Sequence, residues 1–252
     1  TNIQTHLLAF LDCEGPADEN YNDLKNILDK IKIRENQHEF KSLLHLILNI
    51  TNYHHLQMNF FSKIEQILRF FKDDMKKYFT NSELYRIFES NKRILLFLIE
   101  EKIIFIDEYI FKKMIKYKKT SFKYPQYFQP EIKSFLNDEF ITKYKEETNN
   151  DIDEVYFWIE EIKNELPENF FEKRKIGEND SKLCELIRKD LIDEFIIFIN
   201  RYSYSLDSKI KTSIYETNLL LLEKNNNVSL IEYAAFYGSI KIFDYLKLNG
   251  VE

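Results

Sequence analysis

Glycine and proline are scarce in this 252-residue sequence, which has four of each. An average protein of this length would contain roughly 30 of the two together. Sheet folds with many tight turns need these residues at fixed turn positions, and so do the glycine-rich loops that bind phosphate. Their scarcity therefore argues against a β fold and against a nucleotide-binding loop, and it favours a chain built of helices.

Cysteine is also rare, since the sequence holds only Cys13 and Cys184. Two cysteines cannot build a disulfide framework, so we expect an intracellular, cytoplasmic protein in a reducing compartment. Uninterrupted apolar runs are short, as at Leu219 to Leu222, whereas a membrane-spanning helix needs about 20 residues. We therefore predict a soluble chain with no membrane span.

Neither sign of charge dominates the sequence. The formal net charge is −6, from 36 basic and 42 acidic residues, and both signs are mixed along the chain. A general nucleic-acid binder would show a basic excess, so nucleic acid is not the expected partner. Mixed charge is typical of the exposed faces of helices.

Apolar residues recur at spacings of three and four through most of the chain, which predicts helices of modest length, often in pairs. One predicted hairpin joins a helix that starts after Asn36 to another over 59–71. A second pair lies on either side of Ser90 and Asn91. Asn36, Ser82 and Asp107 stand where helix N-caps are expected, and a further helix is expected over 151–165. Helix pairs that cannot each close a core are typical of a solenoid, so we predict an all-α fold of stacked helical hairpins.

The last 24 residues, SLIEYAAFYGSIKIFDYLKLNGVE from Ser229, carry the most specific pattern. Ala234 and Ala235 are small where two helices would approach closely. Gly238 and Gly250 permit the left-handed conformation that ends a helix. This segment resembles an ankyrin repeat, and so we expect the solenoid to end in one. It departs from the family pattern with Ser229, Leu230 and Glu232 in place of the usual threonine, proline and histidine.

Two earlier segments fit the same frame as degenerate copies. The number of residues from Ser90 to Lys102 equals the number from Gly238 to Gly250. Asp190 aligns with Gly238, and this places Phe195 and Phe198 on the apolar seam of the second helix. Neither segment has the alanine pair or the glycine turn.

The whole chain also resembles a greatly expanded family of ankyrin-repeat proteins from parasitic flagellate protists. Besides the C-terminal segment, the resemblance is carried by KIRENQHEFKSLLHLI from Lys32, DDMKKYFTNSELYRIFESNKRILLFLIEEKI from Asp73, YFQPEIKSF from Tyr127 and FEKRKIGENDSKLCELIR from Phe171. It implies a helical domain of unknown function over 1–176. It also implies the start of an ankyrin-like array over 177–252, with 229–252 as its clearest and truncated repeat. It implies no enzymatic activity.

Ankyrin repeats commonly meet partners through the turn before the first helix and through outward positions of that helix. Carried over, these positions are Glu223, Asn225, Asn226, Val228, Phe236 and Tyr237. The resemblance thus implies a non-catalytic scaffold for protein–protein interaction. Phe236 and Tyr237 are either interface anchors or packing residues against an adjacent helix. Because the array would be only begun, part of Ile240, Phe243 and Tyr245 would face a missing neighbour, and we expect this end to fray or to be covered by a second copy.

An alternative from another class is a helical RNA-binding protein that uses the basic and aromatic segment 112–124, where lysines alternate with Tyr117, Phe122 and Tyr124. The segment has no arginine, and the acidic total charge favours a solvated helix end. A helical enzyme whose site cannot be recognised in one sequence is a third alternative.

Metal and catalytic patterns are weak in this sequence. His38 and His45 would stand about 10.5 Å apart along a helix, which is too far for one metal ion. Over 149–160 the acidic spacing resembles a calcium loop, but Glu154 stands where the loop needs glycine. We predict no metal, no cofactor and no catalytic residue.

Overall fold

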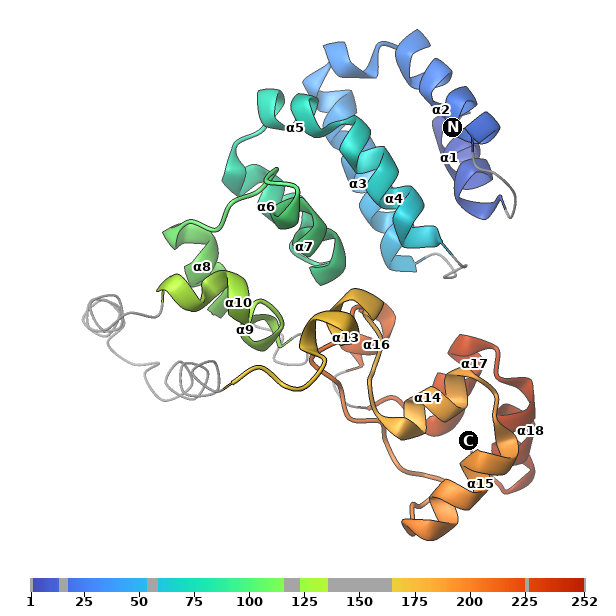
Figure 1. The fold of residues 1–252 in the computed structure, drawn as a ribbon. Coiled ribbons are helices and arrows are strands. Elements are labelled where there is room, and N and C mark those ends of the chain that lie inside the picture. The colour runs from blue at the N-terminus through green and yellow to red at the C-terminus, as the bar shows by residue number, and fades with distance from the viewer. Residues whose placement is uncertain are drawn as a thin grey trace. The chain divides into compact units, whose positions relative to one another are not determined.

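The computed structural model describes residues 2–13, 18–53, 59–115, 123–135, 165–224 and 227–251. Within these ranges the chain is all-α, as predicted, and the β structure is confined to one antiparallel bridge between Lys209 and Ser229. The chain divides into two compact units, residues 1–110 and 111–252 (Figure 1). The domain boundary expected at residue 177 lies inside the second unit and stays a prediction.

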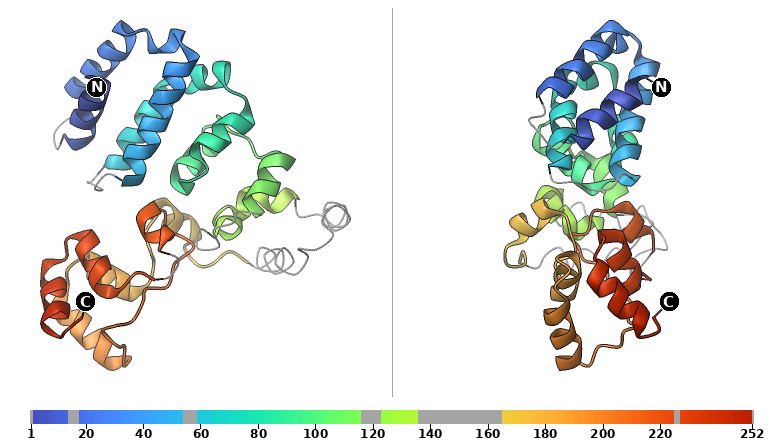
Figure 2. Two further views of the ribbon diagram at one scale, coloured as in Figure 1. Left: turned by 180° about the vertical axis from the view of Figure 1, so that it is seen from behind. Right: turned by 90° about the vertical axis from the view of Figure 1, so that its right-hand side faces the viewer.

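The first unit is a row of antiparallel helix pairs. Its elements are α1 (Asn2–Asp12), α2 (Asp18–Lys30), the 3-10 turn η1 (Ile33–Glu35), α3 (Gln37–Tyr53), α4 (Phe60–Phe70), α5 (Lys72–Tyr78), α6 (Asn81–Phe88) and α7 (Lys92–Glu100). Figures 1 and 2 show α1 beside α2, α3 beside α4 and α6 beside α7. The predicted hairpins α3–α4 and α6–α7 are therefore confirmed.

The core of the first unit is rich in aromatic rings. Phe40 from α3 is fully buried, and its ring centroid lies 5.1 Å from that of Phe71 and 5.7 Å from that of Phe79. Burying one such side chain contributes roughly 1.5–3 kcal/mol to folding. This clustering explains how short helices, none of which would be stable alone, hold together.

Two of the three predicted N-caps are confirmed. The side-chain oxygen of Asn36 accepts hydrogen bonds from the amides of His38 and Glu39 at 3.0 and 3.3 Å. Asp107 accepts one from the amide of Ile110 at 2.8 Å, in the first turn of α8 (Glu108–Ile115). Both side chains satisfy amides that the helix leaves unpaired.

The Ser82 prediction was wrong, because α6 begins at Asn81 and Ser82 lies inside its first turn. Thr80 is the N-cap. Its hydroxyl accepts from the amide of Glu83, and the Glu83 carboxylate accepts from the amide of Thr80 at 2.8 Å. This reciprocal capping box has the Thr-x-x-Glu spacing, which is legible in the sequence.

The side chain of a buried lysine caps the C-terminal end of α1. The ammonium of Lys63, on α4, donates to the carbonyl oxygens of Leu11 and Cys13 at 2.9 and 2.6 Å. These carbonyls lie at and just beyond the last turn of α1, where no intrahelical partner exists. The lysine therefore joins the first helix to the fourth.

The second unit contains shorter helices. They are α9 (Tyr124–Tyr127), α10 (Gln129–Ile132), η3 (Lys133–Phe135), α13 (Phe170–Ile176), α14 (Lys182–Arg188), α15 (Ile192–Arg201), α16 (Leu219–Glu223), α17 (Leu230–Tyr237) and α18 (Ile240–Leu248). The helix predicted over 151–165 lies outside the described residues, apart from its final position. No helix in the described ranges is long and apolar enough to cross a bilayer.

Arg174 anchors α13 to α9 and α10. Its buried guanidinium makes a two-pronged ion pair with Glu131 at 2.7 and 2.9 Å and also donates to the carbonyl of Tyr127 at 3.1 Å. Such planar, bidentate geometry is specific to arginine. It fixes the position from which α13 leads into the C-terminal hairpins.

Candidate functional site in the stacked C-terminal hairpins

The C-terminal part of the second unit consists of two helical hairpins packed side by side. Helix α14 contacts α17, and α15 contacts α18, so that equivalent helices lie against each other (Figures 1 and 2). One shared apolar core runs through them, with Cys184, Phe195, Leu230, Ile242 and Leu246 all fully buried. Each hairpin therefore shields an apolar face of the other from water.

The two hairpins turn in the same way. Asp190 and Gly238 both adopt left-handed backbone angles, with φ of 50° and 68°. At the first turn, the amides of Asp190 and Leu191 donate to the carbonyls of Ile187 and Leu186. At the second, the amides of Gly238 and Ser239 donate to the carbonyls of Ala235 and Ala234. Gly250 is also left-handed, with φ of 80°, so the predictions for both glycines are confirmed.

The apolar seam predicted for the earlier second helix is confirmed at Phe195 and only in part at Phe198. Phe195 and Ile199 are the buried residues of α15, as Ile242 and Leu246 are of α18. Phe198 is only half-buried. Phe198 packs against the shared core, so Phe195 is confirmed on the seam and Ile199 takes the second buried position.

The alanine pair is confirmed at one position only. Ala234 is fully buried in the core shared by the hairpins, whereas Ala235 is exposed. Adjacent residues on a helix point about 100° apart, so a single close helix crossing needs only one of them to be small.

Asp190 caps a helix that belongs to the other hairpin. Its two carboxylate oxygens accept from the amides of Ile242 and Lys241 at 3.0 and 3.1 Å. Ser239, which precedes α18, makes no cap of its own, and its hydroxyl instead donates to the carbonyl of Ile187 at 2.5 Å. The turn of each hairpin thus satisfies backbone groups of the other, and this holds the two in register.

We expect Asp190→Gly to lower the free energy of unfolding by about 0.5 kcal/mol, the low end of the range for removing a capping side chain. Glycine tolerates the positive φ, so the loss reports the missing carboxylate and not backbone strain. Asp190→Asn keeps one acceptor oxygen and should lose less than half as much. Urea unfolding followed by circular dichroism measures all three proteins. Equal stability of Asp190→Gly and the parent chain would contradict the capping role.

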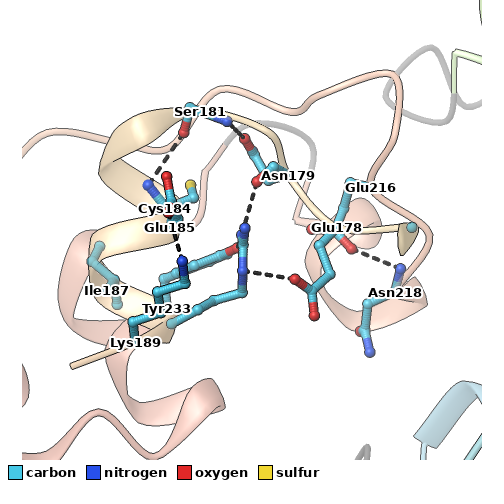
Figure 3. A network of polar contacts seen from close by, with 12 residues as sticks. Glu178, Asn179, Ser181, Cys184, Glu185, Ile187, Lys189, Glu216, Asn218 and Tyr233 are labelled. Carbon is cyan, nitrogen blue, oxygen red and sulfur yellow. Dashed lines mark hydrogen bonds and ion pairs between the residues drawn. The ribbon is translucent and has the colours of Figure 1, made fainter. Parts of the chain in front are cut away.

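Arg188 is the centre of a polar network between α14 and α17. One of its terminal nitrogens donates to the Tyr233 hydroxyl and to the carbonyl of Asn179, both at 2.8 Å. Its Nε pairs with Glu178 at 2.8 Å. Figure 3 shows Tyr233 reaching into this network from α17, while Glu178 and Asn179 approach from the segment before α14. The arginine therefore joins three separate pieces of chain.

Neighbouring side chains extend the network. The Asn179 amide donates to the carbonyl of Lys211 at 2.8 Å, and its oxygen accepts from the amide of Ser181 at 3.1 Å (Figure 3 shows the latter bond). The Ser181 hydroxyl accepts from the amide of Cys184 at 3.3 Å and caps α14. These bonds explain why polar residues are tolerated beside the core.

The thiol and the tyrosine hydroxyls beside this network are held in their neutral forms. Burial raises the pKa of the Cys184 thiol to about 11, and burial raises the pKa of the Tyr233 and Tyr237 hydroxyls well above the usual value for tyrosine. A thiol with so high a pKa has very little thiolate near neutral pH and is a poor nucleophile. The cluster is therefore arranged to join helices.

Glu232 stands where the ankyrin pattern has histidine, and the structure gives it a local role. Its carboxylate accepts from the amide of Ser229 at 2.8 Å and pairs with Lys224 at 3.0 Å. The bond from the Ser229 amide, followed by that from Lys224, lowers the pKa of Glu232 to about 2. Leu230, in place of proline, is fully buried. Both residues that differ from the ankyrin pattern therefore stabilise this hairpin, Glu232 through its hydrogen bonds and Leu230 through its burial.

The lowered pKa of Glu232 predicts a pH dependence of stability. The ordinary pKa of the group is 4.5 and its folded pKa is about 2. Its contribution is therefore complete above about pH 4.5 and is lost as the pH falls toward 2. Glu232→Gln should remove about 1 kcal/mol at pH 7, because the carboxylate is partly exposed and screened, and should flatten the acid slope. Urea unfolding between pH 2 and 7 checks this, with exposed Glu168→Gln as the control. An unchanged acid slope would contradict it.

The predicted interaction residues do not form one exposed patch. Glu223 is exposed at the end of α16, while Asn225 and Asn226 lie outside the described residues. Val228 is buried, with 5% of its surface exposed, and its carbonyl accepts from the amide of Ile210 at 2.8 Å. The prediction that Val228 faces a partner was therefore wrong, since its side chain belongs to the core.

Phe236 and Tyr237 are both half-buried. Their ring centroids lie 4.9 Å apart, and the Tyr237 ring lies 4.8 Å from that of Tyr233. The guanidinium of Arg188, on the adjacent helix α14, lies 5.8 Å from the centroid of the Tyr237 ring, so Tyr237 packs against an adjacent helix. Phe236 keeps part of its ring at the surface.

The basic and aromatic segment loses one of its aromatics to the core. Tyr124 is 1% exposed, and its ring packs on Phe128 at 5.5 Å, so it cannot stack on a base. Lys123 donates to the carbonyl of Thr212 at 2.8 Å. Residues 116–122 lie outside the described ranges.

The stretch 149–160, whose acidic spacing resembles a calcium loop but lacks its glycine, lies outside the described residues. Within the described part of the chain, no group of three or more histidine, cysteine, aspartate or glutamate side chains could hold a metal ion.

Sequence reasoning aligned Asp190 with Gly238 but missed its cap on α18, and it missed Arg188 altogether. For Asp190 a signal existed, because aspartate is among the few residues that tolerate left-handed angles. For Arg188 no pattern pointed to Tyr233, which lies 45 residues further along the chain.

We compared the chain with known protein families, with curated proteins and with solved structures, and none of the three comparisons gave a match.

Proposed function

We propose that this chain is a non-catalytic protein-interaction scaffold whose C-terminal hairpins are ankyrin-like. The observation that carries this proposal is the repeated geometry of α14–α15 and α17–α18. The two hairpins share a left-handed turn at an equivalent position and stack helix on equivalent helix. Scaffolds of stacked hairpins present extended surfaces on which partners bind.

The spacing of these hairpins is longer than that of an ankyrin array. Asp190 and Gly238 lie 48 residues apart (238 − 190), whereas the ankyrin period is 33. Helix α16 and its flanking segments occupy the additional length. Our proposal therefore treats α14–α15 as a unit related to the ankyrin repeat with an insertion, and it includes membership of the protist ankyrin-repeat family.

The proposed partners are other proteins in the cytoplasm. Of the predicted interaction residues, Glu223 is exposed and Phe236 is partly exposed, and we propose that the binding surface lies around these two. Self-association through the C-terminal repeat is a part of the proposal that rests on Ile240, which is 69% exposed.

Site-specific photocrosslinking tests the proposed surface. A photoreactive amino acid replaces Phe236 in one variant and the exposed Lys182 of α14 in a control. We expect a discrete cross-linked protein with the first and none with the second, and Glu223→Lys should weaken its capture about tenfold or more. Identical products at both positions, or capture that Glu223→Lys leaves unchanged, would contradict the assignment.

A further inference from the structure

The outer face of α15 carries an acid, an aliphatic residue and a base at even spacing. Asp193, Ile197 and Arg201 follow one another at intervals of four residues, and all three are exposed. With a rise of 1.5 Å per residue, the two charges lie about 6 Å along the helix on either side of Ile197. Ile197 is 58% exposed, which is unusual for an isoleucine in the middle of an amphipathic helix.

Neither charge is paired within the part of the chain that the structure describes. Among the described residues, no hydrogen bond or ion pair reaches the Asp193 carboxylate or the Arg201 guanidinium. The lysines of the neighbouring helix behave differently, since Lys182 and Lys189 both pair with Glu185, at 2.9 and 2.7 Å. The stripe on α15 therefore keeps both of its charges available for an external partner.

Exposed aromatic residues continue this surface beyond the end of the helix. Tyr202 and Tyr204 are 59% and 45% exposed, and their rings pack against Phe198 at 4.8 and 5.7 Å. The amide of Tyr204 donates to the carbonyl of Ile199 at 2.9 Å and fixes the turn that presents them. Tyrosines held in this way are typical interface anchors.

We propose that this face of α15 binds the same face of a second copy of the chain. In an antiparallel two-fold arrangement Ile197 meets Ile197 of the second copy on the symmetry axis. Asp193 then lies opposite Arg201 of the second copy, and Arg201 opposite its Asp193. A two-fold interface must be complementary to itself, and this stripe meets that condition because opposite charges stand at equal distances from a central apolar residue.

The charge pattern is what favours a second copy over another partner. A stripe of one sign would favour a partner of opposite charge, whereas equal and opposite charges about a centre complement their own rotated image. One helix and two tyrosines make a small interface, so the dimer is expected to be weak and concentration-dependent. This surface is separate from Glu223 and Phe236 and does not depend on the scaffold proposal.

Disulfide trapping at the expected axis is the first test. In the full chain carrying Cys13→Ser, Ile197→Cys should give a disulfide-linked dimer under mild oxidation, because two-fold symmetry brings position 197 next to itself. Lys182→Cys, exposed on α14, is the matched control and should stay monomeric. Failure of Ile197→Cys to cross-link above the level of the control would overturn the proposal.

Charge exchange is the second test, with sedimentation equilibrium at several concentrations as the readout. Asp193→Arg and Arg201→Asp should each weaken self-association about tenfold or more, since each places like charges opposite one another. The double variant, Asp193→Arg with Arg201→Asp, should regain most of the affinity that each single variant loses. A double variant no tighter than either single variant would overturn the proposal. So would a dimer that Ile240→Asp abolishes while Ile197→Asp leaves it intact.

Discussion

Replacing Ala234 by leucine should lower the free energy of unfolding by about 3 kcal/mol, while the same change at Ala235 should alter it by less than about 0.5 kcal/mol. The two alanines are neighbours on α17 and share a helix propensity. Ala234 is fully buried between the hairpins, and Ala235 is exposed. Three extra carbon atoms at position 234 must therefore push apart helices that are already in contact.

Chemical denaturation of the parent chain and the two variants provides the measurement. A difference between the variants of less than about 1 kcal/mol would show that α17 does not cross its neighbours closely at Ala234. Ala235→Leu serves as the control, because it adds the same apolar volume where only water is displaced.

Arg188→Met should cost about 2 kcal/mol of stability, less than breaking a fully buried ion pair, because Glu178 keeps 36% of its side chain exposed. Methionine fills a similar volume but leaves the Tyr233 hydroxyl and the carbonyl of Asn179 without the donor that each uses at 2.8 Å. A buried polar group that loses its partner is penalised by its full desolvation cost. The exposed Lys175→Met removes a positive charge without these contacts and should be nearly neutral.

A double-mutant cycle with Tyr233→Phe separates the arginine–tyrosine contact from the rest of the network. The coupling between the two residues should be about 1–2 kcal/mol, as for a hydrogen bond to a charged group. Additive losses, or an Arg188→Met variant as stable as Lys175→Met, would contradict the role of Arg188 in joining α14 to α17.

The predictions made from the sequence were most successful where structure is local. A helix is fixed by bonds between residues four apart, so apolar spacing was enough to predict the hairpins α3–α4 and α6–α7. The left-handed turns at Gly238 and Gly250 were predicted correctly for the same reason, since glycine alone adopts such angles without strain.

The site was less predictable, because its residues act through contacts between distant segments. Val228 was expected to face a partner, yet its side chain is buried in the core, and its carbonyl accepts from the amide of Ile210. Nothing near Asp190 in the sequence indicates that its carboxylate caps a helix about 50 residues further on. Which of two adjacent alanines is buried is likewise set by the crossing of two helices.

By itself the sequence determined that this chain is helical, where many of its helices begin and end, and that they occur in pairs. These properties depend on each residue and its near neighbours. Only the tertiary structure decided which faces are buried, that Arg188 and Asp190 join the two C-terminal hairpins, and that Ile197 is left between two available charges. Those outcomes depend on how hairpins lie against one another, and helical periodicity is the same whichever neighbour a face meets.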